Sequence, residues 1–160
     1  MDINLLRSVS IMRELSDEEL AAVASLFTLR KAHVKERVLE EGTVVGRFYI
    51  ICEGVMHVRR LAQKREVLLG RLGPGMFFGE VNLFDPGTAT ASIYAMKDTT
   101  LAVCDYDTLI SFMSDNPATG YKLVSAMMSE MSRRLRSTSA RFVNSVYWSA
   151  GAPQQPAAQG

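Results

Sequence analysis

The sequence predicts a mainly β domain with flanking helices. We expect an antiparallel β-roll or jelly roll, of the double-stranded β-helix type, with N-terminal helices and a long C-terminal helix. Between residues 28 and 105, short β-rich runs alternate with turn signals such as Asp85-Pro86-Gly87, which is typical of rolls and sandwiches. On both sides of this region, apolar residues recur at helical spacing.

The composition is that of a soluble globular protein. The chain of 160 residues fits one domain, and 48% of it is hydrophobic and 22% charged,. A net charge of +1 gives no general attraction to nucleic acid or membranes,. The start, Met1 to Arg7, lacks a signal pattern, and no apolar run approaches the roughly 18 residues of a membrane span,. Cys52 and Cys104 lie in apolar runs and are interpreted as reduced, buried thiols,. We therefore expect a cytoplasmic protein with no membrane partner.

Two helical segments are predicted before the strands. Asn4 to Ile11 has the pattern of a short apolar-faced helical turn. Ser16, followed three residues later by Glu19, predicts a capping box at the start of the next helix,. The apolar face of that helix consists of Leu20, Val23, Ala24 and Phe27, at i, i+3, i+4 and i+7,.

Glycine-containing turns divide the β region. Glu53-Gly54 lies between two apolar runs and predicts a tight hairpin,. Gly73-Pro74-Gly75 permits a second tight turn, after which Phe77-Phe78 are expected to anchor a strand,. Gly79-Glu80 is then expected to open a very short helix.

The C-terminal third is predicted to be helical. Tyr106 to Ser114 gives one short helix, and Asn116-Pro117 marks the start of another with Pro at its first position,. This long helix, about 117–147, is interrupted only by Gly120, and at about 1.5 Å per residue it would extend about 45 Å,.

The long helix carries apolar and small residues at alternating spacings of four and three. This is the a/d pattern of a coiled coil, and we interpret it as a homodimerisation face; the alternative is a helix that lies on its own roll. Residues 150–160, rich in Ala, Gly, Pro and Gln, are expected to be disordered, so the domain is placed at 1–149,. The a/d positions are Val124, Met128, Met131, Leu135, Thr138, Phe142 and Ser145.

The segment around Gly79 and Glu80 carries the clearest chemistry. Amides at the start of a short helix favour an anion. A carboxylate beside them suits a ligand that also presents hydroxyl groups, and a phosphate with a ribose indicates a nucleotide. Taken alone, the Gly-rich turn is equally compatible with ordinary hairpin chemistry. It is not a Walker loop, since no Gly-Lys-Ser/Thr follows,.

The stretch from Gly73 to Phe84, followed by Ala91-Ser92-Ile93-x-Ala95, resembles the phosphate-binding cassette of cyclic-nucleotide-binding domains. Leu15 to Leu20 resembles the opening helix of that family, and Phe48 to Gly54 its central hairpin. The resemblance covers about residues 4–147 in the expected order.

The long helix, over Met131 to Ser139, resembles that of the catabolite activator protein branch, in which a Thr-Ser pair at the dimer seam contacts the adenine base. The resemblance implies cyclic AMP or cyclic GMP as candidate ligands, with no catalytic residue, metal or cofactor. The implied ligand-binding residues are Phe78, Gly79, Glu80, Val81, Thr88, Ala89, Thr90 and Ala91 of the cassette, and Arg134, Thr138 and Ser139 of the helix. Arg71, on the preceding strand, is a further candidate ligand-binding residue.

One cassette position departs from the family. The family has an Arg immediately before the small-residue run, where it grips the cyclic phosphate; here that place is Ala89, or Thr88 if the loop is shifted by one. A charge-assisted hydrogen bond is worth about 1.5–3 kcal/mol, so its loss lowers affinity about ten- to a hundred-fold. The hydroxyls of Thr88, Thr90 and Ser92, or the side chain of Arg71, are candidate substitutes.

Other function classes are disfavoured. His33 and His57 have no metal-ligand partner at a recognisable spacing, so a cupin metalloenzyme is not expected,. No Ser, Cys or paired carboxylate has the context of a nucleophile or an acid–base pair. The arginines of the long helix fit a solvated face, with nucleic-acid contact as the alternative. The chain stops at residue 160 without room for the helix-turn-helix of the activator branch, so direct DNA binding is not expected,.

We therefore predict a regulatory sensor module and not an enzyme. It would bind a cyclic nucleotide or a related anionic nucleotide in the β-roll. It would then signal through the C-terminal helix to an output protein that the sequence does not identify. The alternative is a degenerate member of the same fold, which binds no cyclic nucleotide and acts in protein interaction or dimerisation. A different ligand, such as a cyclic dinucleotide, lies between these two interpretations.

Overall fold

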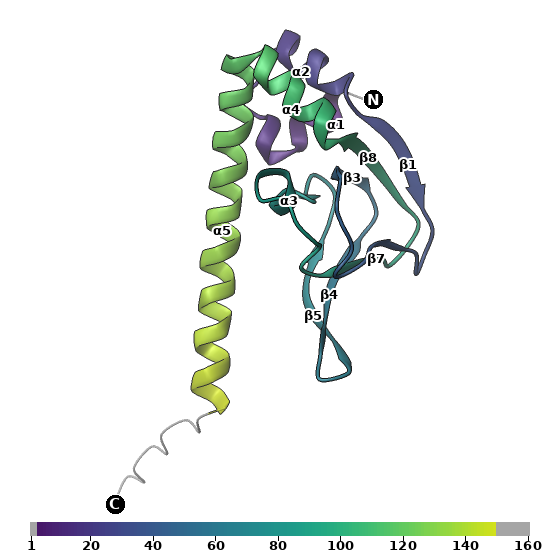
Figure 1. Ribbon diagram of the computed structural model, residues 1–160, viewed down its shortest axis with the longest axis vertical. Helices are drawn as coiled ribbons and strands as arrows, with labels where there is room; N and C mark the ends of the chain where they lie inside the picture. The colour runs from purple at the N-terminus through teal and green to yellow at the C-terminus, as the bar shows by residue number, and fades with distance from the viewer. Residues whose placement is uncertain (1–2, 150–160) are drawn as a thin grey trace, which may run out of the picture.

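The computed structural model describes residues 3–149 and shows eight strands in two antiparallel four-stranded sheets, with helices around them (Figure 1). The predicted β-roll class is confirmed. The first sheet has the order β1 (Thr28–Ala32), β8 (Thr99–Asp105), β3 (Arg47–Glu53) and β6 (Phe77–Phe78). The second has the order β2 (Arg37–Leu39), β7 (Ser92–Ala95), β4 (Met56–Ala62) and β5 (Arg65–Leu72).

The predicted hairpin at Glu53-Gly54 is wrong. β3 pairs with β6 and β8 in the first sheet, while β4 pairs with β5 and β7 in the second. Both edges of β3 are already occupied, so β4 cannot pair with it. Gly54, with φ of +112°, instead turns the chain from one sheet to the other,. The tight hairpin joins β4 to β5 through Gln63 and Lys64, both with positive φ,.

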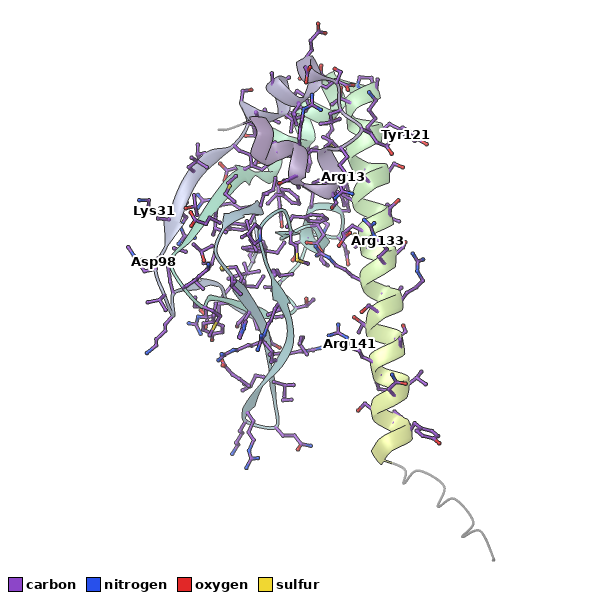
Figure 2. The ribbon with its side chains drawn as sticks, turned by 180° about the vertical axis from the view of Figure 1, so that it is seen from behind. Arg13, Lys31, Asp98, Tyr121, Arg133 and Arg141 are labelled. Atoms are coloured by element: carbon purple, nitrogen blue, oxygen red, sulfur yellow. The ribbon has the colours of Figure 1, made fainter. Side chains whose placement is uncertain are left out.

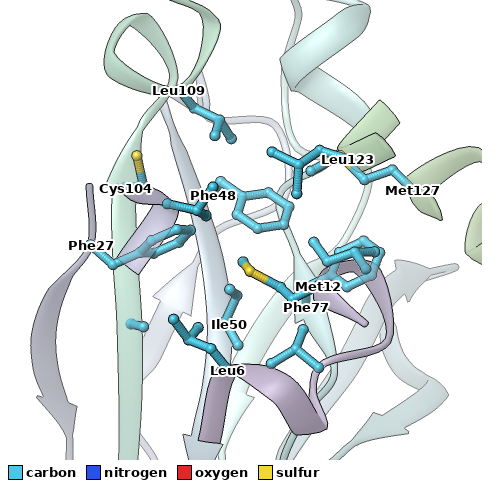
Figure 3. Packing of buried hydrophobic residues seen from close by; sticks show 14 of the residues in the cluster. Leu6, Met12, Phe27, Phe48, Ile50, Phe77, Cys104, Leu109, Leu123 and Met127 are labelled. Carbon is cyan, nitrogen blue, oxygen red and sulfur yellow. The ribbon is translucent and has the colours of Figure 1, made fainter. Parts of the chain in front are cut away.

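Strand β3 divides the core into two parts because its side chains alternate between the two faces of its sheet,. Phe48 and Ile50 join a cluster between the sheet and the helices (Figure 3). Tyr49 and Ile51 face a second cluster inside the roll. Cys52 and Cys104 are free, buried thiols, as predicted.

The N-terminal helices differ in detail from the prediction. The segment expected at Asn4 to Ile11 is split into α1 (Ile3–Ser8) and the 3₁₀ helix η1 (Ser10–Met12). The capping box of Ser16 and Glu19 is confirmed at the start of α2 (Asp17–Ala24).

Phe27, expected on the apolar face of this helix, lies beyond its end. The Ser25 hydroxyl donates to the Ala22 carbonyl at 2.7 Å, in competition with continued helical bonding,. Phe27 is nevertheless buried in the core.

Helices α4 (Tyr106–Asp115) and α5 (Pro117–Ser149) follow the strands, and α5 begins at the predicted Pro. Leu123 and Met127 of α5 are each 1% exposed and pack on the helical side of the core. Further along, the helix runs beside the roll (Figure 1), and Met128, Leu135 and Phe142 are 56, 68 and 68% exposed. The first part of α5 therefore lies on its own domain, and the rest presents unpartnered apolar side chains.

Within residues 3–149, no helix is both long and apolar enough to cross a membrane. The predicted disordered segment, 150–160, lies outside the described residues.

Candidate ligand-binding site

A cavity of about 860 Å³ lies between the inner face of the roll and α5. β4, β5, β7, the turn after β6, and one face of α5 form its walls. Ten of the twelve predicted site residues line it: Arg71, Phe78, Gly79, Glu80, Val81, Ala89, Thr90, Ala91, Arg134 and Thr138.

Thr88 and Ser139 are not among the lining residues. Thr88 forms an isolated β-bridge with Val44, and its carbonyl accepts a hydrogen bond from the Asn82 side chain at 3.3 Å. Ser139 lies on the exposed face of α5, four residues after Leu135 and three before Phe142. The predicted site is thus divided among the cavity, the loop at Thr88 and the exposed face of α5.

The turn at Gly79 aims the cassette carboxylate into the cavity. Gly79 has φ of +87°, and a Cβ there would lie 2.5 Å from the Arg47 carbonyl oxygen, so only glycine fits,. The Tyr106 hydroxyl donates to the Gly79 carbonyl and holds the turn from the other side. The four-residue helix α3 (Val81–Phe84) follows, as predicted. Glu80 is its N-cap residue, but its side chain does not cap the helix.

Glu80 instead joins a buried charge cluster with α5. Arg134 donates through Nη1 to Glu80 at 2.9 Å and through Nε to Glu130 at 3.2 Å. Its Nη2 donates to the Phe77 carbonyl at 3.0 Å, and the guanidinium lies 4.5 Å from the centre of the Phe77 ring,. Glu80 is 6% exposed. Burial raises its pKa, and the charge of Arg134 acts against that rise,.

Some polar groups of the cassette region already form hydrogen bonds within the protein. The Ala89 amide donates to the Thr43 carbonyl at 2.8 Å, and its carbonyl accepts from the Gly42 amide at 2.9 Å. The Ser92 hydroxyl accepts from the Glu41 amide at 2.9 Å. Thr90, whose side chain is exposed, is the hydroxyl residue of this loop that lines the cavity.

Arg71 lies at the rim. It is the cross-strand neighbour of His57 and occupies the opposite strand face from buried Leu72. The pKa of His57 is lowered by burial first and then by the charges of Arg71 and Arg59. The part of the chain that the structure describes contains no cluster of His, Cys, Asp and Glu able to hold a metal ion.

Sequence reasoning missed several cavity residues of α5: Glu130, Arg133, Ser137 and Arg141. Their spacing contained the signal, since they lie within one or two turns of Arg134 and Thr138 on the same side of one helix. Figure 2 shows Arg141 extending from α5 toward the roll.

A sequence profile described as the cyclic nucleotide-binding domain matches residues 29–116, more than half of the chain. The chain belongs to the cyclic nucleotide-binding domain family. It is 33% identical, over 111 residues, to the "CRP-like cAMP-activated global transcriptional regulator" of Mycobacterium tuberculosis (strain CDC 1551 / Oshkosh). That match covers 69% of this chain and 48% of the relative, so the chain spans about half the length of that regulator.

Solved structures agree with the family's fold. The N-terminal domain of a transcriptional regulator from Streptomyces coelicolor A3(2) has a TM-score of 0.71 and 27% identity, covering 86% of this chain and 94% of that one. A cyclic nucleotide-binding domain from Methylobacillus flagellatus has a TM-score of 0.81 at 22% identity, covering 89% and 81%.

Ala89 is the position at which the family resemblance implies a phosphate-binding arginine, and its side chain is a methyl group. Ala89 lines the cavity and is 4% exposed. An alanine side chain has no hydrogen-bond donor and no charge. Ala89 therefore contributes no side-chain charge to the cavity wall, at the position where the resemblance implies contact with a cyclic phosphate.

Proposed function

We propose that this domain is a regulatory module that binds a nucleotide in its central cavity and signals through α5. The convergence of Glu80, Arg134 and Thr138 on one cavity carries the proposal. A buried carboxylate can accept hydrogen bonds from ribose hydroxyls, and Arg134 holds it in place and balances its charge. Thr138 offers a hydroxyl to the base from one turn further along α5.

The same cavity supports weak binding of cyclic AMP or cyclic GMP. Without a guanidinium at Ala89, the cyclic phosphate loses a charge-assisted bond worth about 1.5–3 kcal/mol. Arg134 is no ready replacement, because it already bonds Glu80, Glu130 and the Phe77 carbonyl. We expect the native chain to bind cyclic AMP or cyclic GMP with an affinity about ten- to a hundred-fold lower than that of an Ala89→Arg variant.

We also propose that the module is a homodimer through α5. Tyr121, Met128, Leu135 and Phe142 are exposed at intervals of seven residues, the period of a coiled-coil seam,. Figure 2 shows Tyr121 pointing away from the roll. Ser139 lies on the same face as Leu135 and Phe142, so dimerisation would bring it to the seam. A ligand that binds between roll and helix would then bias the geometry of the dimer and its contact with an output protein.

The proposal places the module in the cytoplasm, in a regulatory and not a catalytic role. The second candidate function is a degenerate fold that binds no cyclic nucleotide and serves in dimerisation or protein interaction. Two observations favour it: the methyl group at Ala89, and the ion pairs that already satisfy Arg134.

Calorimetric titration of nucleotide-stripped protein with cyclic AMP and cyclic GMP, up to millimolar concentration, separates the two. The sensor predicts weak binding by the native chain, its loss in Glu80→Ala, and a roughly ten- to hundred-fold gain in Ala89→Arg. Glu14→Ala, an exposed carboxylate outside the cavity, is the matched control. If Ala89→Arg folds but binds neither nucleotide, the degenerate alternative replaces the sensor.

A further inference from the structure

Some of the charged side chains that line the cavity form ion pairs with one another, and others do not. Glu80 and Glu130 are paired with Arg134, and Glu130 also pairs with Arg133 at 2.6 Å. The two remaining charged lining residues, Arg71 and Arg141, form no ion pair with any residue in the described range 3–149. The uncompensated charge of the cavity is therefore positive and belongs to these two arginines.

Arg141 is held at the mouth of the cavity by a backbone contact. Its Nη1 donates to the Leu69 carbonyl of β5 at 3.2 Å. This bond joins α5 to an edge strand, across 72 positions of sequence. A single neutral acceptor leaves most of the five guanidinium N–H donors of Arg141 available to a ligand. Arg71 follows Leu69 by two residues on β5, so both positive charges flank the same stretch of strand.

Arg141 lies about two helical turns along α5 from Arg134, the residue that pairs with Glu80,. Arg141 comes seven residues after Arg134, and seven residues correspond to about 10 Å along the helix axis, at about 1.5 Å per residue. In a 3′,5′-cyclic nucleotide the phosphate is fused to the ribose, directly beside the 2′-hydroxyl. A ligand that reaches both Glu80 and the turn of α5 that carries Arg141 must therefore be longer than a ribose with its fused phosphate.

We propose that Arg141 is the principal anion-binding residue of this cavity and that the ligand is an extended nucleotide. Its ribose hydroxyls meet Glu80, and a second phosphate, further along α5, meets the Arg141 guanidinium, with the charge of Arg71 adding to the attraction. A nucleoside triphosphate or a dinucleotide has this chemistry. A volume of about 860 Å³ is at the upper end of the range for small-molecule sites,. This inference rests on the proposed function of the same cavity.

Calorimetry with ATP, cyclic di-GMP, AMP and cyclic AMP tests the inference on the native chain and on Arg141→Gln. Arg136→Gln is the control, because Arg136 lies on the same helix, outside this cavity, and has no ion-pair partner within the described chain. We expect ATP or cyclic di-GMP to bind more tightly than AMP and cyclic AMP, and the better of the two identifies the source of the second phosphate. Arg141→Gln should weaken that binding about ten- to a hundred-fold, with little change in Arg136→Gln.

Three results would overturn the inference. Equal weakening by the two variants would show a general charge effect. Tight cyclic AMP binding that is insensitive to Arg141→Gln would place the anion elsewhere and leave the proposed function standing. The inference also fails, and the proposed function stands, if the native chain binds none of the four nucleotides while Ala89→Arg binds cyclic AMP. If Ala89→Arg also binds nothing, the proposed function itself fails, and the inference fails with it.

Discussion

Glu80 and Arg134 are 54 positions apart in the chain, yet Nη1 of Arg134 lies 2.9 Å from Oε1 of Glu80. The pair joins the turn after β6 to the long helix α5. Glu80 is nearly inaccessible, so an unpaired carboxylate there would carry a large desolvation cost,. The contact therefore couples the position of α5 to the ionisation of one group in the cavity.

Arg134→Met should destabilise the fold in a pH-dependent way. Burial raises the pKa of Glu80, and Arg134 opposes the rise. A carboxyl with a raised folded pKa contributes stability below its unfolded pKa, and this is lost as pH rises through the folded pKa. Removing Arg134 raises the folded pKa further. We expect a loss of about 3 kcal/mol near pH 8 that shrinks toward pH 5, measured by urea unfolding.

The double variant Glu80→Gln/Arg134→Met is the control for that prediction. It has no carboxylate at position 80, so the pH-dependent part of the loss should disappear. An Arg134→Met variant with the same loss at both pH values would show that the ion pair does not couple helix position to the ionisation of Glu80.

The ionisation of Glu19 should make the free energy of unfolding depend on pH in the acid range. Its pKa is lowered to about 2, first by hydrogen bonds from Lys122, the shorter at 2.7 Å, and then by the Ser16 amide. A depressed pKa contributes stability above the unfolded value, here 4.5, that is lost as pH falls through about 2,. The difference in unfolding free energy between the native chain and Glu19→Gln should be constant above about pH 5 and vanish near pH 2. Glu18→Gln, in the same helical turn, should show no comparable change.

Two leucines of α5 should separate folding from dimerisation. Leu123→Ala removes a side chain that is 1% exposed and should cost about 2–5 kcal/mol of unfolding free energy,. Leu135→Ala, at 68% exposure, should change the stability of the dilute chain by less than about 0.5 kcal/mol,. In sedimentation velocity, however, Leu135→Ala should shift the proposed α5 dimer toward monomer. A native chain that sediments as a monomer, or a profile unchanged by Leu135→Ala, would contradict dimerisation through this face of α5.

Gly79→Ala should destabilise the cassette turn. Its φ of +87° and the approach of a Cβ to within 2.5 Å of the Arg47 carbonyl oxygen predict a cost of about 1–3 kcal/mol,. Gly46→Ala is the matched control, because no atom lies within 4 Å of a Cβ built there. Thermal unfolding of the two variants measures the difference. Equal midpoints would show that the turn relaxes without strain.

Several elements could be predicted because their signals are local. The capping box needs only Ser16 and Glu19, and the start of α5 needs only Pro117, since each is decided within one turn of backbone,. The role of Glu53-Gly54 could not be predicted in this way. A glycine with positive φ permits a reversal, but whether the next strand pairs with β3 depends on which strands already occupy its edges.

The residues of the candidate site show the same distinction between local signals and contacts made by distant segments. The cassette motif identified Glu80 and the surrounding turn, because those residues are consecutive and their order is itself the signal. The helical spacing from Arg134 and Thr138 could have identified Arg141 as a cavity residue. Its contact with the Leu69 carbonyl could not be predicted, since that oxygen is 72 positions away and any residue type could provide it. Arg71 was predicted at the site, but its strand face is decided by the pairing of β5 with β4.

By itself, then, the sequence determined the β-roll class, the helix boundaries set by Ser16 and Pro117, and the turn at Gly79. These are properties of consecutive residues and of their periodicity. Only the tertiary structure decided which face of α5 covers the cavity, that Glu80 pairs with Arg134, and which arginines of the cavity form no ion pair. Those outcomes depend on packing two distant segments against each other, where burial makes each charge require a partner that no local pattern specifies.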